Sequence, residues 1–231
     1  MRNMSYMWNN FNIKTFPAET IVYRDGYYQE QFSTLPEQDF ILNKYDLPIH
    51  IIYVGRIERD NVLNINLMAA SQPVFLTVDI ENNLPAFLNI FIKNAGKNSE
   101  IRGHILCKNS SDLAVKIVAE HDAPENAILV QTKVICKKDS YSLLSGTTYI
   151  NQNCVGVRSD IQFAGYATDS SAKIKFIPSQ RILATPEYAD HSAYMFNVKP
   201  DTENYLRTCG LSGAEVKNAM IEAFKNDFNL F

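Results

Sequence analysis

The sequence predicts a mostly β protein that ends in helices. Short runs rich in Ile, Val, Leu, Phe, Tyr and Thr recur from about residue 49, separated by Asn, Ser, Asp, Lys and Gly. β-Branched and aromatic residues favour strands, so many short runs at nearly regular spacing indicate an all-β architecture. From about residue 199 the apolar residues instead follow a helical period.

The strand-like runs alternate as strands do. Within residues 62–67, Leu63, Ile65 and Leu67 point to one side, and the asparagines between them point to the other. The runs with this character are residues 49–54, 62–67, 74–78, 87–92, 101–106, 113–118, 128–130, 147–150, 161–163, 173–177 and 181–183.

The connections favour a coiled solenoid over a sandwich or an up-and-down barrel, although composition leaves all three open. Tight hairpins typically carry Asn-Gly or Asp-Gly, and the only such dipeptide, Asp25-Gly26, precedes the strand series. The connections at residues 108–112 and 137–140 instead resemble short polar corners. In a solenoid, each strand continues around such a corner and the core grows coil by coil.

Two helices are predicted near the C-terminus. Residues 201–208 form the first, which begins after Pro200 and ends before Gly210. Ser212 is the N-cap of the second helix, and Glu215 completes a capping box with it.

The second helix carries one apolar stripe. Val216, the first residue of the stripe, is placed to pack against Leu211 as a hydrophobic staple. The stripe either covers the core of the chain itself or docks a partner, and different residues can serve each purpose. Its members are Val216, Ala219, Met220, Ala223 and Phe224.

Residues 1–48 are aromatic-rich and irregular, and we expect them to form extended or short elements against the core. The chain therefore divides into an N-terminal segment (1–48), a β core (49–198) and a C-terminal two-helix subdomain (199–231).

Composition and charge exclude several classes of function. The 231 residues are 46% hydrophobic and 20% charged, as in an ordinary globular protein. A net charge of −3 gives no electrostatic reason to expect nucleic acid. The apolar runs are too short to cross a membrane, and the N-terminus lacks the apolar stretch of a secretory signal. We expect a cytoplasmic protein.

No familiar catalytic motif occurs, so we expect no catalytic residues and no enzymatic activity. The sequence has no phosphate loop, His-Glu-x-x-His or Gly-x-Ser-x-Gly. Its four cysteines form no Cys-x-x-Cys pair and are expected to be reduced, mostly buried thiols.

Three histidines receive structural interpretations. His50 lies in an apolar run and is expected to be a hydrogen-bonded core residue. His104 and Cys107 are three apart on a strand, point to opposite faces and therefore do not chelate together. His121 lies between Glu120 and Asp122, which would raise its basicity, and we expect it in a solvated corner.

The C-terminal block resembles the SufB/SufD family of the SUF iron–sulfur cluster assembly system. That family carries Ser-His-Gly-Ala or Glu-His-Glu-Ala, an acidic stretch, Tyr-Leu-x-x-Arg-Gly-Leu-Ser and a helix that ends in Ala-Phe. Here the sequence has Asp190-His191-Ser192-Ala193, then Tyr205-Leu206 and Gly210-Leu211-Ser212, and closes with Ala223-Phe224. Residues 132–150 resemble a repeated coil of the family, and the resemblance covers about residues 100–231.

The resemblance implies a right-handed parallel β-helix (solenoid) with a small C-terminal helical subdomain. It implies a non-catalytic scaffold that pairs through the end of its β-helix with a SufB-like sister subunit or a second copy. It also implies docking of a SufC-like ABC-type ATPase through Tyr205, Leu206, Val216, Met220 and Phe224. His191 matches a SufD-type histidine and is the candidate iron or cluster ligand. No tightly bound cofactor is expected, only a transient iron–sulfur cluster or iron.

The chain departs from the family pattern in several places, which makes it closer to a short SufD-like form. The usual N-terminal helical region is largely missing, and several residues are missing between Pro186 and His191. Asp190 replaces the cysteine before the SufD-type histidine, and residues 176–183 lack the SufB-type cysteine.

Two other functions stay open at this point. One is a β-helical enzyme or binding protein acting on carbohydrate, although no ladder of carboxylates and basic groups is visible along one strand face. The other is a cluster carrier that uses Cys154 or Cys209 with His191.

Overall fold

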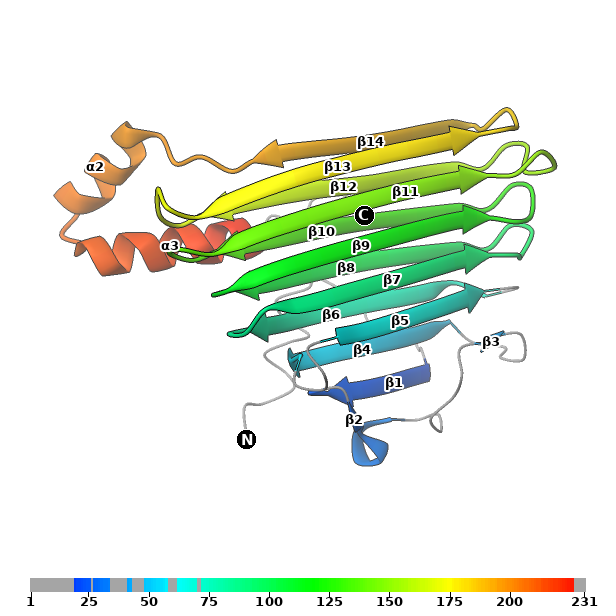
Figure 1. The fold of residues 1–231 in the computed structure, drawn as a ribbon, viewed down its shortest axis with the longest axis horizontal. Helices are drawn as coiled ribbons and strands as arrows, with labels where there is room; N and C mark the ends of the chain where they lie inside the picture. The colour runs from blue at the N-terminus through cyan, green and yellow to red at the C-terminus, as the bar shows by residue number, and fades with distance from the viewer. Residues whose placement is uncertain are drawn as a thin grey trace.

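The computed structural model describes residues 19–25, 27–33, 41–42, 48–57, 62–69 and 72–226. Over these ranges the chain forms a parallel β-solenoid of about five turns, followed by two helices (Figure 1). The mostly β prediction and the preference for a solenoid are confirmed. The elements are β1 (Glu19–Arg24), β2 (Tyr27–Tyr28), η1 (Glu30–Phe32), β3 (Ile41–Leu42), β4 (Ile49–Arg56), β5 (Val62–Ala69), β6 (Val74–Asn82), β7 (Ala86–Asn94), β8 (Glu100–Asn109), β9 (Asp112–His121), β10 (Ala127–Cys136), β11 (Tyr141–Ile150), β12 (Arg158–Ala167), β13 (Lys173–Ile182), β14 (Tyr188–Met195), α2 (Pro200–Thr208) and α3 (Gly213–Asn226).

Successive strands alternate between two sheets from β4 onward. Sheet A has the order β14-β12-β10-β8-β6-β4-β1-β2, and sheet B has the order β13-β11-β9-β7-β5-β3. The described pairs are parallel, apart from the antiparallel pair of β1 with β2. Each coil therefore contributes one strand to each sheet and satisfies the backbone groups of the coil before it.

The predicted runs coincide with β4 to β13, and two of them, residues 173–177 and 181–183, belong to the single strand β13 apart from Leu183. Sheet A begins earlier than expected, because β1 pairs with β4 and lies inside residues 1–48. Strand β14 was not predicted, because its few aliphatic residues give no strand-like run.

Alternating side chains fill the space between the two sheets. In β9, Leu113, Val115, Ile117 and Ala119 are buried, while the residues between them are partly or fully exposed. The same alternation confirms the predicted faces of β5, where Ile65 and Leu67 are buried and Asn64 is exposed.

Gly146 makes room for an aromatic ring in this interior. It faces inward from β11, and a Cβ at this position would lie 2.8 Å from Cζ of Phe163 and 3.1 Å from Cγ2 of Ile161. Phe163 is fully buried and stacks on Phe176, with ring centroids 6.1 Å apart. The close approach therefore depends on the absence of a side chain at residue 146.

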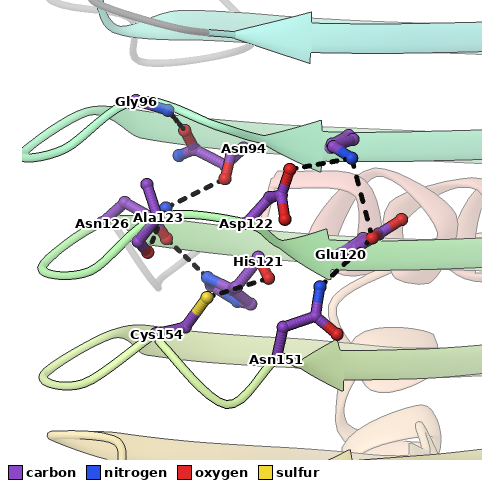
Figure 2. Close-up of polar contacts among 10 residues, drawn as sticks. Asn94, Gly96, Glu120, His121, Asp122, Ala123, Asn126, Asn151 and Cys154 are labelled. Carbon is purple, nitrogen blue, oxygen red and sulfur yellow. Dashed lines mark hydrogen bonds and ion pairs between the residues drawn. The ribbon is translucent and has the colours of Figure 1, made fainter.

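Two buried polar networks hold the corners between strands. On one side, Asn109 Nδ2 donates to Ser142 Oγ (2.7 Å) and to the Tyr141 carbonyl (3.0 Å), and its Oδ1 accepts from Asn82 Nδ2 (2.8 Å). On the other, Asn126 Nδ2 donates to the carbonyls of Asn94 (3.0 Å) and Ala123 (2.9 Å), as Figure 2 shows. Each network joins neighbouring coils, so the corners reinforce the backbone ladder.

His121 belongs to the second network, and our prediction of a solvated corner was wrong. Its side chain is fully buried, and Nδ1 lies 2.5 Å from Asn126 Oδ1. Because the Asn126 amide nitrogen already donates to two carbonyls, its oxygen is the acceptor and His121 Nδ1 carries the proton. Burial lowers the pKa of His121, opposed in part by this hydrogen bond. The acidic chain neighbours were therefore a misleading signal.

The other histidine interpretations are confirmed. His50 is buried, and its Nε2 lies 2.8 Å from Thr77 Oγ1. His104 lies on the outer face of β8, whereas Cys107 faces the core. Burial lowers the pKa of His50 to about 4, with a smaller effect from His104. Burial also lowers the pKa of His104 to about 4, with smaller effects from Arg102 and Lys133.

Both helices begin as predicted, and the first also ends as predicted. Gly210 follows α2 with a φ of +94°, in the left-handed region that favours glycine. At the start of α3, Ser212 N–H donates to Glu215 Oε2 (2.8 Å), and Glu215 N–H donates to Ser212 Oγ (3.4 Å). The capping box is therefore confirmed.

Gly146→Val should destabilise the solenoid by about 1 to 3 kcal/mol, because the added methyl groups overlap the Phe163 ring. Urea unfolding measures the change in the free energy of unfolding. The matched control is Thr147→Val, whose side chain points outward from the same strand. Equal stability of wild type and Gly146→Val would contradict the packing described for this coil.

Stability should fall as pH is lowered from 7.5 to 5.0. His50 and His104 bind protons below about pH 6.5 in the unfolded chain but only near about pH 4 when folded. The part of the free energy of unfolding that depends on these neutral histidines is complete above pH 6.5 and is lost as the pH falls toward 4. At pH 5 the loss is about 1 to 2 kcal/mol for each histidine. Urea unfolding at the two pH values should show a smaller loss for the double variant His50→Gln/His104→Gln.

The control for this experiment is His191→Gln, because His191 is exposed. An equal loss of stability in wild type and in the double variant would show that the buried histidines do not cause the pH dependence.

Candidate functional site

The last coil of the solenoid leaves two strand edges without a neighbour. Within the described chain, β13 ends sheet B and β14 ends sheet A. Apolar and aromatic side chains on these strands and just after β13 are exposed. They are 38 to 49% exposed and comprise Ile182, Leu183, Tyr188, Tyr194 and Met195. Open edges next to exposed apolar groups are the features that a partner protein covers.

The open edge of β13 lacks one hydrogen-bond donor near its centre. Lys173 N–H donates to the Ser140 carbonyl (2.9 Å), and Leu183 N–H donates to the Ile150 carbonyl (2.9 Å), so odd-numbered residues bond to β11. The even-numbered residues therefore direct their backbone groups to the open edge. Pro178 is one of them and has no N–H to offer. This arrangement discourages the addition of a continuous strand along β13.

His191 lies in β14 at the open end. It is paired with Ile161 of β12, which faces the core, so His191 continues an interior row that no later coil covers. The imidazole is consequently exposed, and the backbone N–H of His191 donates to Asp190 Oδ1 (2.8 Å). The predicted ligand residue is thus placed where a partner at the end of the solenoid would meet it.

Asp160 and Asp190 form a carboxylate pair that sequence reasoning missed. They are register partners on the outer face of β12 and β14. Burial raises the pKa of Asp160, and the nearby Asp190 raises it further, against the hydrogen bond from Gln162 Nε2 (2.7 Å). Thirty residues separate the two in sequence, so only the strand register brings them together.

The cysteines do not join His191 in a metal centre. Cys154 is 1% exposed, its thiol donates to the His121 carbonyl (3.1 Å), and burial raises its pKa. Cys209 is exposed at the end of α2. In the ranges that the structure describes, no group of three or more His, Cys, Asp or Glu is arranged to hold a metal ion. All four cysteines are free, and three are buried, as predicted.

Helix α3 packs on the outer face of sheet A. The Phe224 ring is fully buried, with its centroid 5.8 Å from Tyr166 and 5.3 Å from Phe196. Lys133 of β10 is also fully buried; its Nζ donates to the Phe224 carbonyl (2.7 Å) and lies 5.2 Å from the ring centroid. A cation at the C-terminal end of a helix is favourable, so Lys133 helps to fix α3 on the sheet.

The five residues predicted to dock an ATPase fall into two groups. Phe224 and Met220 belong to one cluster with residues of β8, β10 and β12, so they hold α3 to the solenoid, and Val216 is buried as well. Tyr205 is 66% exposed and Leu206 is half-buried, both on α2. Helix α2 buries none of its residues, so its surface is open to solvent.

Phe224→Ala should release α3 from the solenoid, because truncation of a fully buried phenylalanine typically destabilises by about 3 to 5 kcal/mol. Amide hydrogen exchange in α3 reports the release as faster exchange. Ala223→Ser is the control, since residue 223 is exposed. Unchanged exchange in α3 of Phe224→Ala would mean that other contacts dock the helix.

The described chain is thus a parallel β-solenoid with two open strand edges at its last coil and an exposed helix. Residues 81–224 match the family model described as the SufBD core domain of SUF system FeS cluster assembly, and the chain belongs to that family. The match runs from β6 to α3 and includes the open end. No curated protein matches the chain.

Family membership supports a role in SUF iron–sulfur cluster assembly. The family is a non-catalytic assembly component whose members work in complexes with other subunits. None of the described helices is both long and apolar enough to span a membrane.

Proposed function

We propose that this chain is a non-catalytic, SufD-like scaffold subunit of the SUF machinery. It pairs with a second subunit through its last coil and docks an ABC-type ATPase through α2. The observation that carries the proposal is the open end, where exposed apolar groups accompany two unpaired strand edges.

The pairing partner is a SufB-type sister subunit or a second copy of this chain. Contact with β14 would bury Tyr188, Tyr194 and Met195, which are 38 to 40% exposed. The β13 edge lacks a donor at Pro178, so β14 offers the more complete backbone edge. An interface that buries these side chains together with the strand edges is specific to one partner. Strand addition along an exposed edge could instead repeat without end.

The ATPase docks on α2. Tyr205 is the most exposed large hydrophobic residue in the described chain at 66%, and tyrosine is enriched at interface hot spots. Arg207 and Glu203 form an ion pair on the same helix (2.6 Å), which stiffens this surface. The contact of α3 with β10 and β12 then connects the docked helix pair to the last coils.

His191 is the residue that we assign to the cargo. The iron or nascent cluster is transient, and this chain supplies one imidazole, a common iron ligand, at the pairing interface. The partner subunit supplies the remaining ligands. This division accounts for the missing family cysteines and favours a SufD-like over a SufB-like role.

The pairing claim is tested by co-expression of the chain with the SUF ATPase and the SufB-type subunit of the same source. Size exclusion with light scattering measures the mass of each complex. Ile182→Lys/Met195→Lys should abolish pairing, because two charges would be buried without partners. Phe87→Lys is the matched control, since Phe87 is 55% exposed on β7, away from the open end. Normal pairing of the double variant would contradict the interface.

The same experiment tests docking of the ATPase separately. Tyr205→Ala should weaken ATPase binding by about 2 kcal/mol, roughly thirtyfold, while pairing is retained. Tyr27→Ala is the control, because Tyr27 is 60% exposed at the other end of the solenoid. Unchanged ATPase binding by Tyr205→Ala would remove α2 from the proposed docking surface.

A further inference from the structure

Several cations on the outer surface of the solenoid form ion pairs. Lys93 pairs with Asp122 (2.9 Å), Lys108 with Asp79 (2.8 Å) and Lys137 with Glu81 (3.2 Å). Such exposed pairs contribute little to stability, but they leave a locally balanced charge. A region whose cations lack such partners therefore carries a local positive charge.

The last two strands of sheet B form such a region, which we name the β11–β13 face. Its cations are Lys173, Lys175 and Arg181, which point outward from β13, are exposed, and form no ion pair with any residue that the structure describes. Neither strand directs a carboxylate outward. The outward residues are Tyr141, Leu143, Ser145, Thr147 and Tyr149 of β11 and Lys173, Lys175, Ile177, Ser179 and Arg181 of β13.

The neighbouring strand β9 carries charges of both signs on its outer face. Exposed Lys116 is the register partner of Ser145, next to this face. Of the two outward carboxylates on β9, Glu120 already contacts Lys93 (3.8 Å), and Asp112 lies in the same row as Tyr141 and Lys173, two strands from that lysine. The face therefore has a net positive charge on a chain whose overall charge is −3.

The face also carries the apolar and aromatic groups of a protein interface. Ile177 is 43%, Tyr141 39% and Tyr149 36% exposed. Tyrosine and arginine with an apolar centre are typical of protein–protein contacts, whereas nucleic acid requires a more extensive cationic footprint. Between these side chains, Thr147 Oγ1 and Ser179 Oγ form a hydrogen bond with each other (2.8 Å).

We propose that the β11–β13 face is a docking surface for an acidic protein segment, with Lys173, Lys175 and Arg181 as its cationic contacts. Because Pro178 interrupts the donors of the β13 edge, the segment lies across the face rather than adding to the sheet as a strand. Its carboxylates meet the three cations, and its apolar residues cover Ile177 and the two tyrosines. This surface is separate from α2 and does not depend on pairing at the open end.

The test uses the full chain and a fluorescein-labelled peptide rich in glutamate and leucine, with anisotropy as the readout. Wild type should bind the peptide, and Lys173→Glu/Lys175→Glu/Arg181→Glu should bind it at least about tenfold more weakly. The control is Lys97→Glu/Lys137→Glu/Lys217→Glu, which makes the same change in net charge elsewhere on the surface. It should retain binding within about twofold. A Lys173→Gln/Lys175→Gln/Arg181→Gln variant should also lose binding, without new repulsion.

Three results would overturn the proposal. They are no binding by wild type, an equal loss in the control variant, and tighter binding of a labelled single-stranded oligonucleotide that the first variant abolishes. The last result would assign the face to nucleic acid. Urea unfolding of each variant shows that altered binding does not reflect an altered fold.

Discussion

The parallel backbone ladder is the constraint on which the rest of this structure depends. Every coil takes its hydrogen bonds from the coils on either side, so a solenoid cannot satisfy its own first and last strands. At the N-terminal end of sheet A, the short strand β2 turns back and pairs with β1 through Tyr23–Tyr28 and Arg24–Tyr27. At the other end, β13 and β14 have no such cover among the described residues. The location of the candidate site follows from this asymmetry.

The buried polar side chains also stabilise the stack of coils. Asn82, Asn109 and Asn126 bond to neighbouring coils, and His121 joins them from inside a corner. Buried amides that are satisfied in this way specify one register, because a slip of the coils would leave them without partners. A rigid stack gives the last coil a fixed shape, which a scaffold requires if its partners are to meet the same surface each time.

The sequence predicted the parts of the fold that local patterns encode. The alternation of apolar and polar residues located β4 to β13. Gly210 located the end of α2, and the Ser212–Glu215 capping box located the start of α3. β14 was missed because Asp190 and His191 interrupt any apolar pattern, although the resemblance had already singled out His191.

Features that depend on which strands are neighbours could not be predicted. Asp160 and Asp190 meet only through the register of β12 and β14. Pro178 interrupts the open edge only because the even-numbered residues of β13 direct their backbone groups to that edge. His121 was misplaced for the same reason, since its chain neighbours are acidic but its spatial neighbours bury it. The stripe on α3 was ambiguous because an amphipathic helix has the same sequence whether it covers its own sheet or a partner. The packing of Phe224 against Tyr166 and Lys133 shows that this part of the stripe covers the sheet of the chain itself.

The central claim is that a partner subunit covers the last coil. Amide hydrogen exchange, measured on the chain alone and in complex with the SufB-type subunit and ATPase of the same source, tests it most directly. The account predicts slower exchange in β14 on assembly, with β1 and β2 at the opposite end unchanged. Exchange in β14 that is as fast in the complex as in the free chain would contradict it.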